Sequence, residues 1–298
     1  MLNRLLNGWP LFWFGALVIS GVMVSALPRF GLATPEGVSQ LIAYSVRWAV
    51  PFIFIVTAAS ALASLSPRLK WPLRNRRILG LLFAVAMAWQ ALFIFLLSSV
   101  HSDFYYDEVY FLRDEIEGSC GYIFLVAMTL TSFRSGRRRL TQAQWKTLHR
   151  SGTYFLWAYA YTVYWWNTAY YPDPQPIDYL FYTLGLTAFA LRIAAWARRR
   201  RAASPAHGTG PARMFGAGLL AALALITAAT GRQWQETVSS VLTAPSWSAT
   251  LELWLPYWPF EPFLPLALFG LAAWLWAPGA RAGVTTARPS APRLADPA

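Results

Sequence analysis

The sequence predicts an all-α protein, a polytopic bundle of about eight membrane-spanning helices, and three observations support this. Hydrophobic residues make up 56% of the 298 residues, whereas charged residues make up only 13%, a balance far from that of a soluble domain. The apolar residues form eight long runs. The positive charges gather in the segments between alternate runs, as membrane proteins distribute charge. Lipid is therefore the expected solvent for most of the chain.

Each predicted element is justified by its length, because a helix needs about 20 apolar residues to cross the hydrocarbon core of a bilayer. Only a continuous helix satisfies its own backbone hydrogen bonds there. Six runs meet or nearly meet this length: 10–27, 48–65, 78–100, 151–171, 179–196 and 214–230. Two shorter runs, 118–133 and 262–277, count as spans because they preserve the alternation of charge between successive segments.

The first run also has features of a signal peptide. Arg4 precedes it, and the small triplet Val24-Ser25-Ala26 lies near its end, as at a cleavage site. At 18 residues the run is long for a signal core, so we expect a retained helix. Cleavage would leave all later segments on the same sides of the membrane.

The charges divide between two sets of segments. Numbered from an inside amino terminus, the inside set holds 21 of the 25 Lys and Arg residues, and the outside set holds 12 of the 13 Asp and Glu residues. Because Lys and Arg concentrate in cytoplasmic loops, both termini are predicted to be cytoplasmic.

The composition separates the chain into four parts. Residues 1–197 form the main bundle, and 198–213 form a flexible basic cytoplasmic linker. Residues 214–278 form a two-helix membrane extension. The last part, 279–298, is rich in Pro, Ala and Arg and is predicted to be disordered.

The composition also excludes several classes of function. The net charge of +12 lies in short clusters between apolar runs, so the bilayer, and no nucleic acid, is the expected partner. No Walker loop or Gly-x-Gly-x-x-Gly motif is present, so this chain contains no flavin or nicotinamide domain. Any electrons must come from a partner or a quinone. Cys120 is the single cysteine, which excludes an intramolecular disulfide and a cysteine metal cage. We expect a structural role for it.

Three histidines are candidate ligands for haem, which transmembrane proteins usually hold between imidazoles of two facing helices. His101 lies at the outer end of the third run, His149 at the inner start of the fifth, and His207 in the linker. With a rise of about 1.5 Å per residue and a core about 30 Å thick, His101 and His149 are too far apart to share an iron. For each histidine, an interfacial polar role with a backbone or lipid phosphate partner is the alternative.

Three blocks of sequence resemble the ferric reductase-like transmembrane domain family. They are "RRILGLLFAVAMAWQ" from Arg76, "GYIFLVAMTLTSF" from Gly121 and "LTQAQWKTLHR" from Leu140, in the order and spacing of the family. Bacterial members include the haem-binding membrane subunit of the periplasmic methionine sulfoxide reductase system. The resemblance covers roughly residues 35–195 and leaves 214–298 outside it.

The resemblance implies a six-helix bundle that carries b-type haem and passes electrons from the cytoplasmic or quinone side to an outer acceptor. His149 matches the family's ligand in its Leu-His-Arg block, so it is the predicted cofactor-binding and metal-binding residue. Gln90 and Thr162, or Val163 if the turn has one more residue, stand where the family has the histidines of an outer haem site. Their side-chain oxygens are poor ligands for ferrous haem, so we expect ordinary interhelical hydrogen bonds instead.

Aromatic residues in the fifth run follow helical spacing and should form one face. That face, Tyr154, Trp157, Tyr161 and Tyr164, is either a packed stripe, an electron relay, or a flat-ring pocket for a quinone, carotenoid or chlorophyll-like pigment. Further aromatic residues are expected to form an interfacial belt. They are Trp165, Trp166, Tyr170, Tyr171, Trp234, Trp247, Trp254 and Trp258.

The segment "HSDFYYDEVYFLRDEIE" from His101 holds six carboxylates. It is either a hydrated outer loop or a site for a hard ferric or calcium ion.

Three hypotheses for function follow from the sequence. The first is a divergent ferric reductase-like protein of a bacterial inner membrane, which either carries out transmembrane electron transfer at a degenerate haem site or descends from a protein that does. The second is a haem-free subunit that scaffolds or anchors a larger complex, with protein partners in the membrane or periplasm. The third is a quinone-binding or pigment-binding membrane protein.

Overall fold

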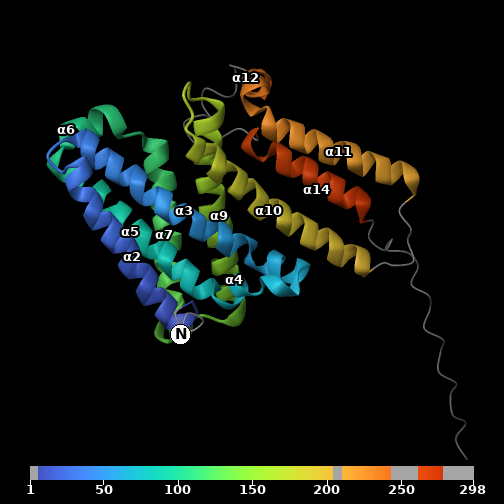
Figure 1. Ribbon diagram of the computed structural model, residues 1–298, viewed down its shortest axis with the longest axis horizontal. Coiled ribbons are helices and arrows are strands. Elements are labelled where there is room, and N and C mark those ends of the chain that lie inside the picture. Colours follow the sequence, from blue (N-terminus) through green and yellow to red (C-terminus); the bar gives the residue numbers. More distant parts are fainter. Residues whose placement is uncertain (1–5, 204–209, 243–260, 278–298) are drawn as a thin grey trace, which may run out of the picture.

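A computed structural model describes residues 6–203, 210–242 and 261–277, and every regular element in these ranges is a helix (Figure 1). Five helices are long and apolar enough to cross a membrane. They are α2 (Gly8–Phe30), α3 (Pro35–Leu65), α5 (Arg76–Val100), α10 (Pro176–Ala202) and α11 (Pro211–Ala229). The all-helical class is therefore confirmed, and the finer count of eight spans stays a prediction.

The other three predicted spans are shorter or more polar helices. These are α7 (Leu112–Thr131), α9 (Gln142–Ala169) and α14 (Leu264–Trp276). α7 begins with acidic residues, and α9 begins with a polar, basic turn. Short helices complete the described chain. They are the 3-10 helices η1 (Pro67–Leu69) and η3 (Glu261–Phe263), the π-helix η2 (Tyr105–Val109), α4 (Trp71–Arg74), α6 (Ser102–Phe104), α8 (Arg134–Arg137) and α12 (Gly231–Leu242).

Two helices begin well before the apolar runs that predicted them. The Thr34 hydroxyl accepts a hydrogen bond from the Gly37 amide at 3.2 Å and caps α3, which starts at Pro35 although the predicted run starts at residue 48. Thr141 and Gln144 form a reciprocal capping box at the start of α9. Such caps satisfy amide groups that a helix start leaves free. They allow both helices to begin in polar sequence ahead of the apolar runs.

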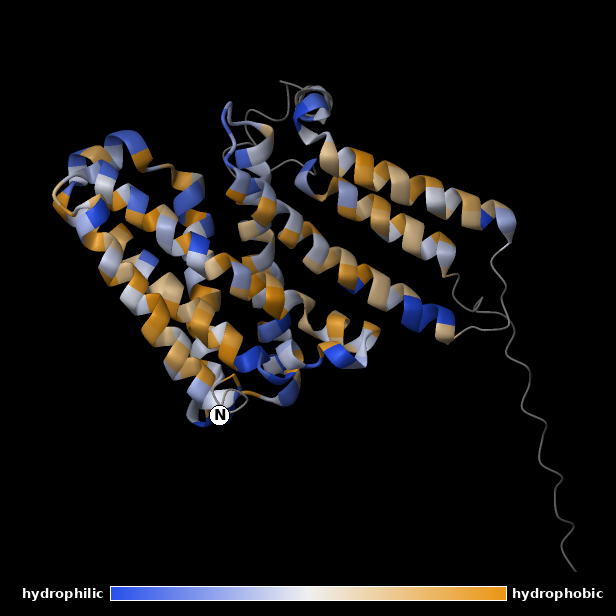
Figure 2. Ribbon diagram, in the orientation of Figure 1, coloured by the Kyte–Doolittle hydropathy of each residue, from blue (hydrophilic) through white to orange (hydrophobic). Residues whose placement is uncertain are grey.

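α3 lies at the centre of the bundle and contacts α2, α5, α9 and α10 (Figure 1). Its inward residues, including Leu41, Ala49 and Phe54, are almost fully buried. The surrounding helices are apolar along much of their length (Figure 2), and many of their large apolar side chains are exposed. An exterior of this kind suits lipid, because hydrocarbon imposes no cost on exposed apolar side chains.

The first predicted span is an integral part of this bundle. In α2, Gly15 lies directly against the Leu82 side chain of α5. The Trp89 indole of α5 donates a hydrogen bond to the Ser20 hydroxyl at 3.2 Å. α2 therefore packs on α5 along several turns.

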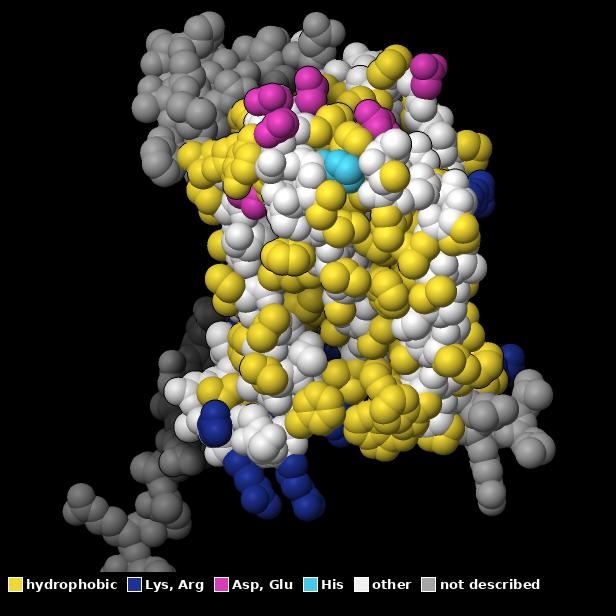
Figure 3. Space-filling view, turned by 90° about the vertical axis from the view of Figure 1, so that its left-hand side faces the viewer, with side chains coloured by type: hydrophobic (Ala, Val, Ile, Leu, Met, Phe, Trp, Pro, Cys, Tyr) yellow, Lys and Arg dark blue, Asp and Glu magenta, His cyan; other side chains and the backbone are white. Residues whose placement is uncertain are grey.

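The charged residues gather at opposite ends of the bundle. Figure 3 shows Asp and Glu mainly at one end and Lys and Arg mainly at the other, with a band of hydrophobic surface between them. The acidic end holds the segment between α5 and α7, and the basic end holds α4, α8 and the end of α10. This polarity matches the alternation expected from the sequence. The assignment of the basic end to the cytoplasm is a prediction.

The C-terminal extension packs on the aromatic face of α9 and on α10. α11 and α14 lie side by side, and both lie on the far side of α10 from α2 (Figure 1). The Tyr161 hydroxyl donates to the Pro262 carbonyl at 2.6 Å, and the Tyr170 hydroxyl donates to Glu261 at 2.8 Å. Trp157, Tyr161 and Tyr164 are at most 3% exposed. The packed aromatic stripe is therefore confirmed for these three residues, whereas Tyr154, the fourth predicted member, is only partly buried and lines a cavity.

Several expectations from the sequence were wrong. α10 continues through the four arginines to Ala202, so the first part of the predicted linker 198–213 is helical. Trp165 is 1% exposed and contacts Trp234 at 5.4 Å, so it belongs to the core and not to an interfacial belt. Cys120 is exposed and does not pack in the core. Trp247, Trp254, Trp258, His207 and the tail 279–298 lie outside the described residues.

The bond between Tyr161 and Pro262 gives a test of how the extension is held. We expect Tyr161→Phe to lower the free energy of unfolding by about 1–3 kcal/mol, because the buried Pro262 carbonyl loses its donor. Tyr171→Phe is the matched control, since the Tyr171 side chain is 60% exposed. The measurement is thermal unfolding in detergent. Equal melting temperatures for the two variants would contradict the described packing.

Candidate functional site

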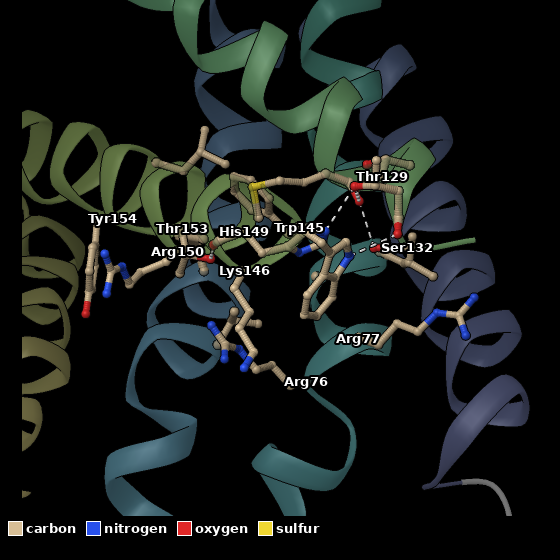
Figure 4. Close-up of a pocket in the computed structure, with 18 of the residues that line it drawn as sticks. Arg76, Arg77, Thr129, Ser132, Trp145, Lys146, His149, Arg150, Thr153 and Tyr154 are labelled. Atoms are coloured by element: carbon tan, nitrogen blue, oxygen red, sulfur yellow. Dashed lines mark hydrogen bonds between the residues drawn. The ribbon is translucent and has the colours of Figure 1, made fainter. Parts of the chain in front are cut away.

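A cavity of about 960 Å³ opens at the basic end of the bundle. α3, α4, α5, α7, α8, α9 and α10 all contribute to its walls. Figure 4 shows that Trp145, His149, Thr153 and Tyr154 follow one another along α9, opposite residues of α5 and α7. The predicted ligand His149 therefore lines this cavity.

The cavity combines an apolar interior with a strongly basic surround. Its apolar lining comes from Ile53, Val56, Leu81, Phe83, Leu125 and Leu156. Its ionisable lining, apart from His149 and Tyr154, is Arg74, Arg76, Arg77, Arg137, Lys146, Arg150 and Arg192. None of the lining residues is an aspartate or a glutamate. Such a surface favours an anionic group attached to an apolar body.

A hydrogen bond to α7 fixes the imidazole of His149. The Nε2 atom lies 3.0 Å from the Thr131 hydroxyl oxygen. That hydroxyl donates its own proton to the Ala127 carbonyl at 2.7 Å, so it accepts from His149 and the network assigns the proton to Nε2. The ring also lies 4.4 Å from the Trp145 ring, centre to centre. His149 thus has a defined orientation and tautomer.

His149 stays neutral at physiological pH. It precedes the apolar run of α9, and burial, followed by the positive charges of Arg76 and Arg137, lowers its pKa to about 4. Burial disfavours the charged imidazolium, and nearby cations disfavour it further. A neutral imidazole is the form that binds metals, but here its Nε2 proton is directed at Thr131.

The lowered pKa of His149 predicts acid sensitivity. Between its ordinary pKa of 6.5 and about 4, the unfolded chain binds more protons at this residue than the folded chain. This contribution to stability is therefore present above pH 6.5 and is lost as the pH falls. We expect the melting temperature to fall less between pH 7 and 4.5 in His149→Gln than in the unchanged protein. His101→Gln is the control, and identical pH profiles for all three proteins would contradict the assignment.

Arg192 lines the cavity and joins three helices. Its guanidinium donates to the Thr57 carbonyl at 3.0 Å, to the Ser60 hydroxyl at 3.2 Å and to the Tyr154 hydroxyl. These bonds join α10 to α3 and α9. From the sequence, Arg192 counted only as one of the inside charges. Its position inside the apolar run 179–196, ahead of the arginine cluster, could have marked Arg192 as a site residue, because a cation within a membrane span usually has a specific role.

Gln90 and Thr162, the two positions at which the resemblance implies missing haem ligands, both form hydrogen bonds. Gln90 accepts from the Tyr122 hydroxyl at 3.0 Å, which joins α5 to α7 as expected. Thr162 donates to the Ala158 carbonyl of its own helix at 2.8 Å, so the expected interhelical bond was wrong there. A threonine hydroxyl readily bonds the carbonyl four residues earlier. Neither residue lines the cavity.

The remaining candidate metal sites gain no support from the described part of the chain. His101 Nε2 lies 3.2 Å from the Leu32 carbonyl, at the acidic end of the bundle and remote from His149. The Tyr105 hydroxyl donates to Glu115 in the acidic segment, and burial and this bond raise its pKa. Across residues 6–203, 210–242 and 261–277, no group of three or more His, Cys, Asp or Glu side chains is placed to hold a metal ion.

The described residues do not fit the family's haem held between two imidazoles. In residues 6–203, 210–242 and 261–277, the cavity offers one imidazole, whose Nε2 is protonated and bonded to Thr131. The outer positions carry Gln90 and Thr162.

Comparison with protein-family models gives no match, and comparisons with curated proteins and with solved structures give none either. The fold and the cavity therefore define the class: an all-helical protein with long apolar helices and a basic cavity at one end.

Proposed function

We propose that the protein is a divergent ferric reductase-like integral membrane protein that works without haem, as a binding or anchoring subunit in a bacterial inner membrane. Support for the resemblance comes from the order and spacing of the three sequence blocks. Support for membrane location comes from the five long apolar helices. Protein partners in the membrane or periplasm belong to this proposal.

One observation carries the haem-free assignment: every position that matches a family ligand already has another partner. Thr131 accepts the Nε2 proton of His149, Tyr122 donates to Gln90, and Thr162 donates within its own helix. Haem binding at His149 would require the loss of the bond to Thr131 and a change of tautomer. This cost favours a haem-free protein.

A visible absorption spectrum tests the haem-free assignment. The protein is produced in haem-replete cells, purified in mild detergent and compared with His149→Ala and with His101→Ala. We expect no Soret band in any of the three samples, and a haem content far below one per chain. A Soret band that is lost in His149→Ala and retained in His101→Ala would contradict the proposal.

A second candidate function is electron transfer through one haem at His149. It is favoured by a neutral imidazole in a cavity of about 960 Å³ with arginines nearby, since arginines suit carboxylate groups such as haem propionates. Haem bound there would supply one-electron chemistry. His149 and the arginines would hold it. The same spectrum separates the two candidates.

The anchoring role predicts a protein contact on the C-terminal extension. α11 exposes Phe215, Leu219, Leu225 and Ile226, each at least 57% exposed. Photo-crosslinking from position 219 in intact cells should give a discrete protein adduct. The control is position 95 of α5, where Phe95 is 67% exposed. If both positions gave lipid adducts and no protein adduct, an anchoring role for this surface would be contradicted.

A further inference from the structure

We propose that the basic cavity binds the phosphate head group of an anionic phospholipid, with part of an acyl chain against the apolar lining. The proposed ligand is a phosphate group attached to an apolar body, and a membrane lipid is the molecule that supplies both. The inference rests on the haem-free proposal, because haem at His149 would occupy the same cavity. A lipid site, a haem site and an empty cavity give different experimental results.

Uncompensated positive charge is the first reason to expect an anion. Seven cationic side chains line the cavity, and no acidic side chain does. The charge of Arg76 interacts unfavourably with that of Arg192, and Arg76 and Arg137 both disfavour a charge on His149. Like charges at close range in a partly buried space raise the free energy of the folded state. A phosphate would remove this repulsion.

The contacts of the cationic side chains give a second reason to expect an anion. Some of these side chains are already bound to other protein groups, whereas others are not. Arg192 is held by α3 and α9, and Arg137 by the Leu140 carbonyl and Gln142. Arg77 lies over the rings of Trp9 and Phe133. In Figure 4 its side chain points away from Arg76.

By contrast, within the described chain we find no hydrogen-bond partner for the charged groups of Arg76, Lys146 and Arg150. These three residues line the cavity from α5 and α9, and their donors are available to phosphate oxygens. Phosphate oxygens are strong acceptors for Arg and Lys.

Location and shape favour a lipid over a free anion. The cavity lies at the basic end of the bundle, where the positive-inside rule places the cytoplasmic leaflet. Basic pockets between membrane helices on that side suit anionic lipid head groups. The apolar lining behind the cations, including Val56, Phe83 and Leu156, has no role for a free phosphate. It suits an acyl chain instead.

The test uses full-length protein, delipidated in detergent, with phosphatidylglycerol, phosphatidylcholine or inorganic phosphate as probes. Thermal unfolding and native mass spectrometry report binding. We expect phosphatidylglycerol to raise the melting temperature and to remain bound, at an apparent affinity well above that of phosphatidylcholine. Inorganic phosphate at the same concentration should have no effect. If inorganic phosphate alone raised the melting temperature, the ligand would be a free anion and not a lipid, and the proposal would be overturned.

The decisive variant is Arg76→Gln/Lys146→Gln. Each Lys or Arg near an anionic membrane lipid contributes about 1 kcal/mol, so the double variant should bind phosphatidylglycerol roughly thirtyfold more weakly. The control is Arg138→Gln/Arg139→Gln, which has the same charge change at exposed positions outside the cavity and should bind unchanged. Equal weakening of phosphatidylglycerol binding in both double variants would show that the lipid is attracted to the basic surface in general. That result would overturn the proposed site. If the decisive variant does not fold, a competition experiment between phosphatidylglycerol and phosphatidylcholine on the unchanged protein replaces it. Equal binding of the two lipids would overturn the proposal.

Discussion

Replacing Gly185 with leucine should have the largest effect on the stability of the folded bundle. A Cβ atom at Gly185 would lie 2.9 Å from Phe54 of α3 and 3.0 Å from Tyr161 of α9. The Gly185 carbonyl accepts the Trp157 indole N–H at 3.0 Å, which holds the backbone in place. Overpacking of a tight core costs about 1–3 kcal/mol, occasionally more. We expect a cost at or above the upper end of this range, because three helices meet at Gly185.

The measurement for Gly185→Leu is the yield of monodisperse protein in mild detergent and its melting temperature. Gly218→Leu is a matched control, because Gly218 lies in the apolar helix α11 and a Cβ there would meet nothing within 4 Å. The control should fold as well as the unchanged protein. Normal yield and stability of Gly185→Leu would show that α3, α9 and α10 do not cross as described.

Replacing Asn75 with alanine should also have a large effect, because it loosens the start of α2. The Asn75 side chain is 2% exposed and accepts from the Gly8 amide at 3.0 Å. It also donates to Asn7 at 3.0 Å and to the Trp71 carbonyl at 3.3 Å. Loss of these bonds should cost about 1–3 kcal/mol, because buried polar groups are left without partners.

Hydrogen exchange localises the effect of Asn75→Ala. Amides at the start of α2, from residue 8 onward, should exchange faster, while those at the centre of α3 should stay protected. Asn167→Ala is the control, since Asn167 loses one bond to Asp178 at the other end of the bundle. Faster exchange at α2 in the control, or unchanged exchange in Asn75→Ala, would contradict the role of Asn75.

The sequence predicted the helices well wherever hydrophobic length determines them. The runs that predicted α5 and α10 differ from the observed helices by a few residues at their ends. Prediction failed where polar residues continue a helix, as in the first turns of α3 and α9, because caps and tertiary contacts determine those limits. α12 went unrecognised because its sequence from Gly231 carries no continuous apolar run.

The candidate site was predicted only in part. Resemblance singled out His149, and the structure places it in the cavity, but the bond that fixes it comes from Thr131 of α7. The convergence of Arg76, Lys146 and Arg192 depends on the packing of α5, α9 and α10. A single sequence contains no direct signal for such packing. Trp165 was misassigned for a similar reason, since its aromatic character suits both an interface and a core.

The topology and the lipid site both require the basic end of the bundle to face the cytoplasm, and cysteine accessibility tests this directly. In a Cys120→Ala background, Asp107→Cys and Arg138→Cys place one thiol at an exposed position at each end. A membrane-impermeant maleimide is applied to spheroplasts before and after permeabilisation. We expect Asp107→Cys to react at once and Arg138→Cys to react only after permeabilisation. Reaction of both thiols before permeabilisation would contradict the topology and the lipid site that depends on it.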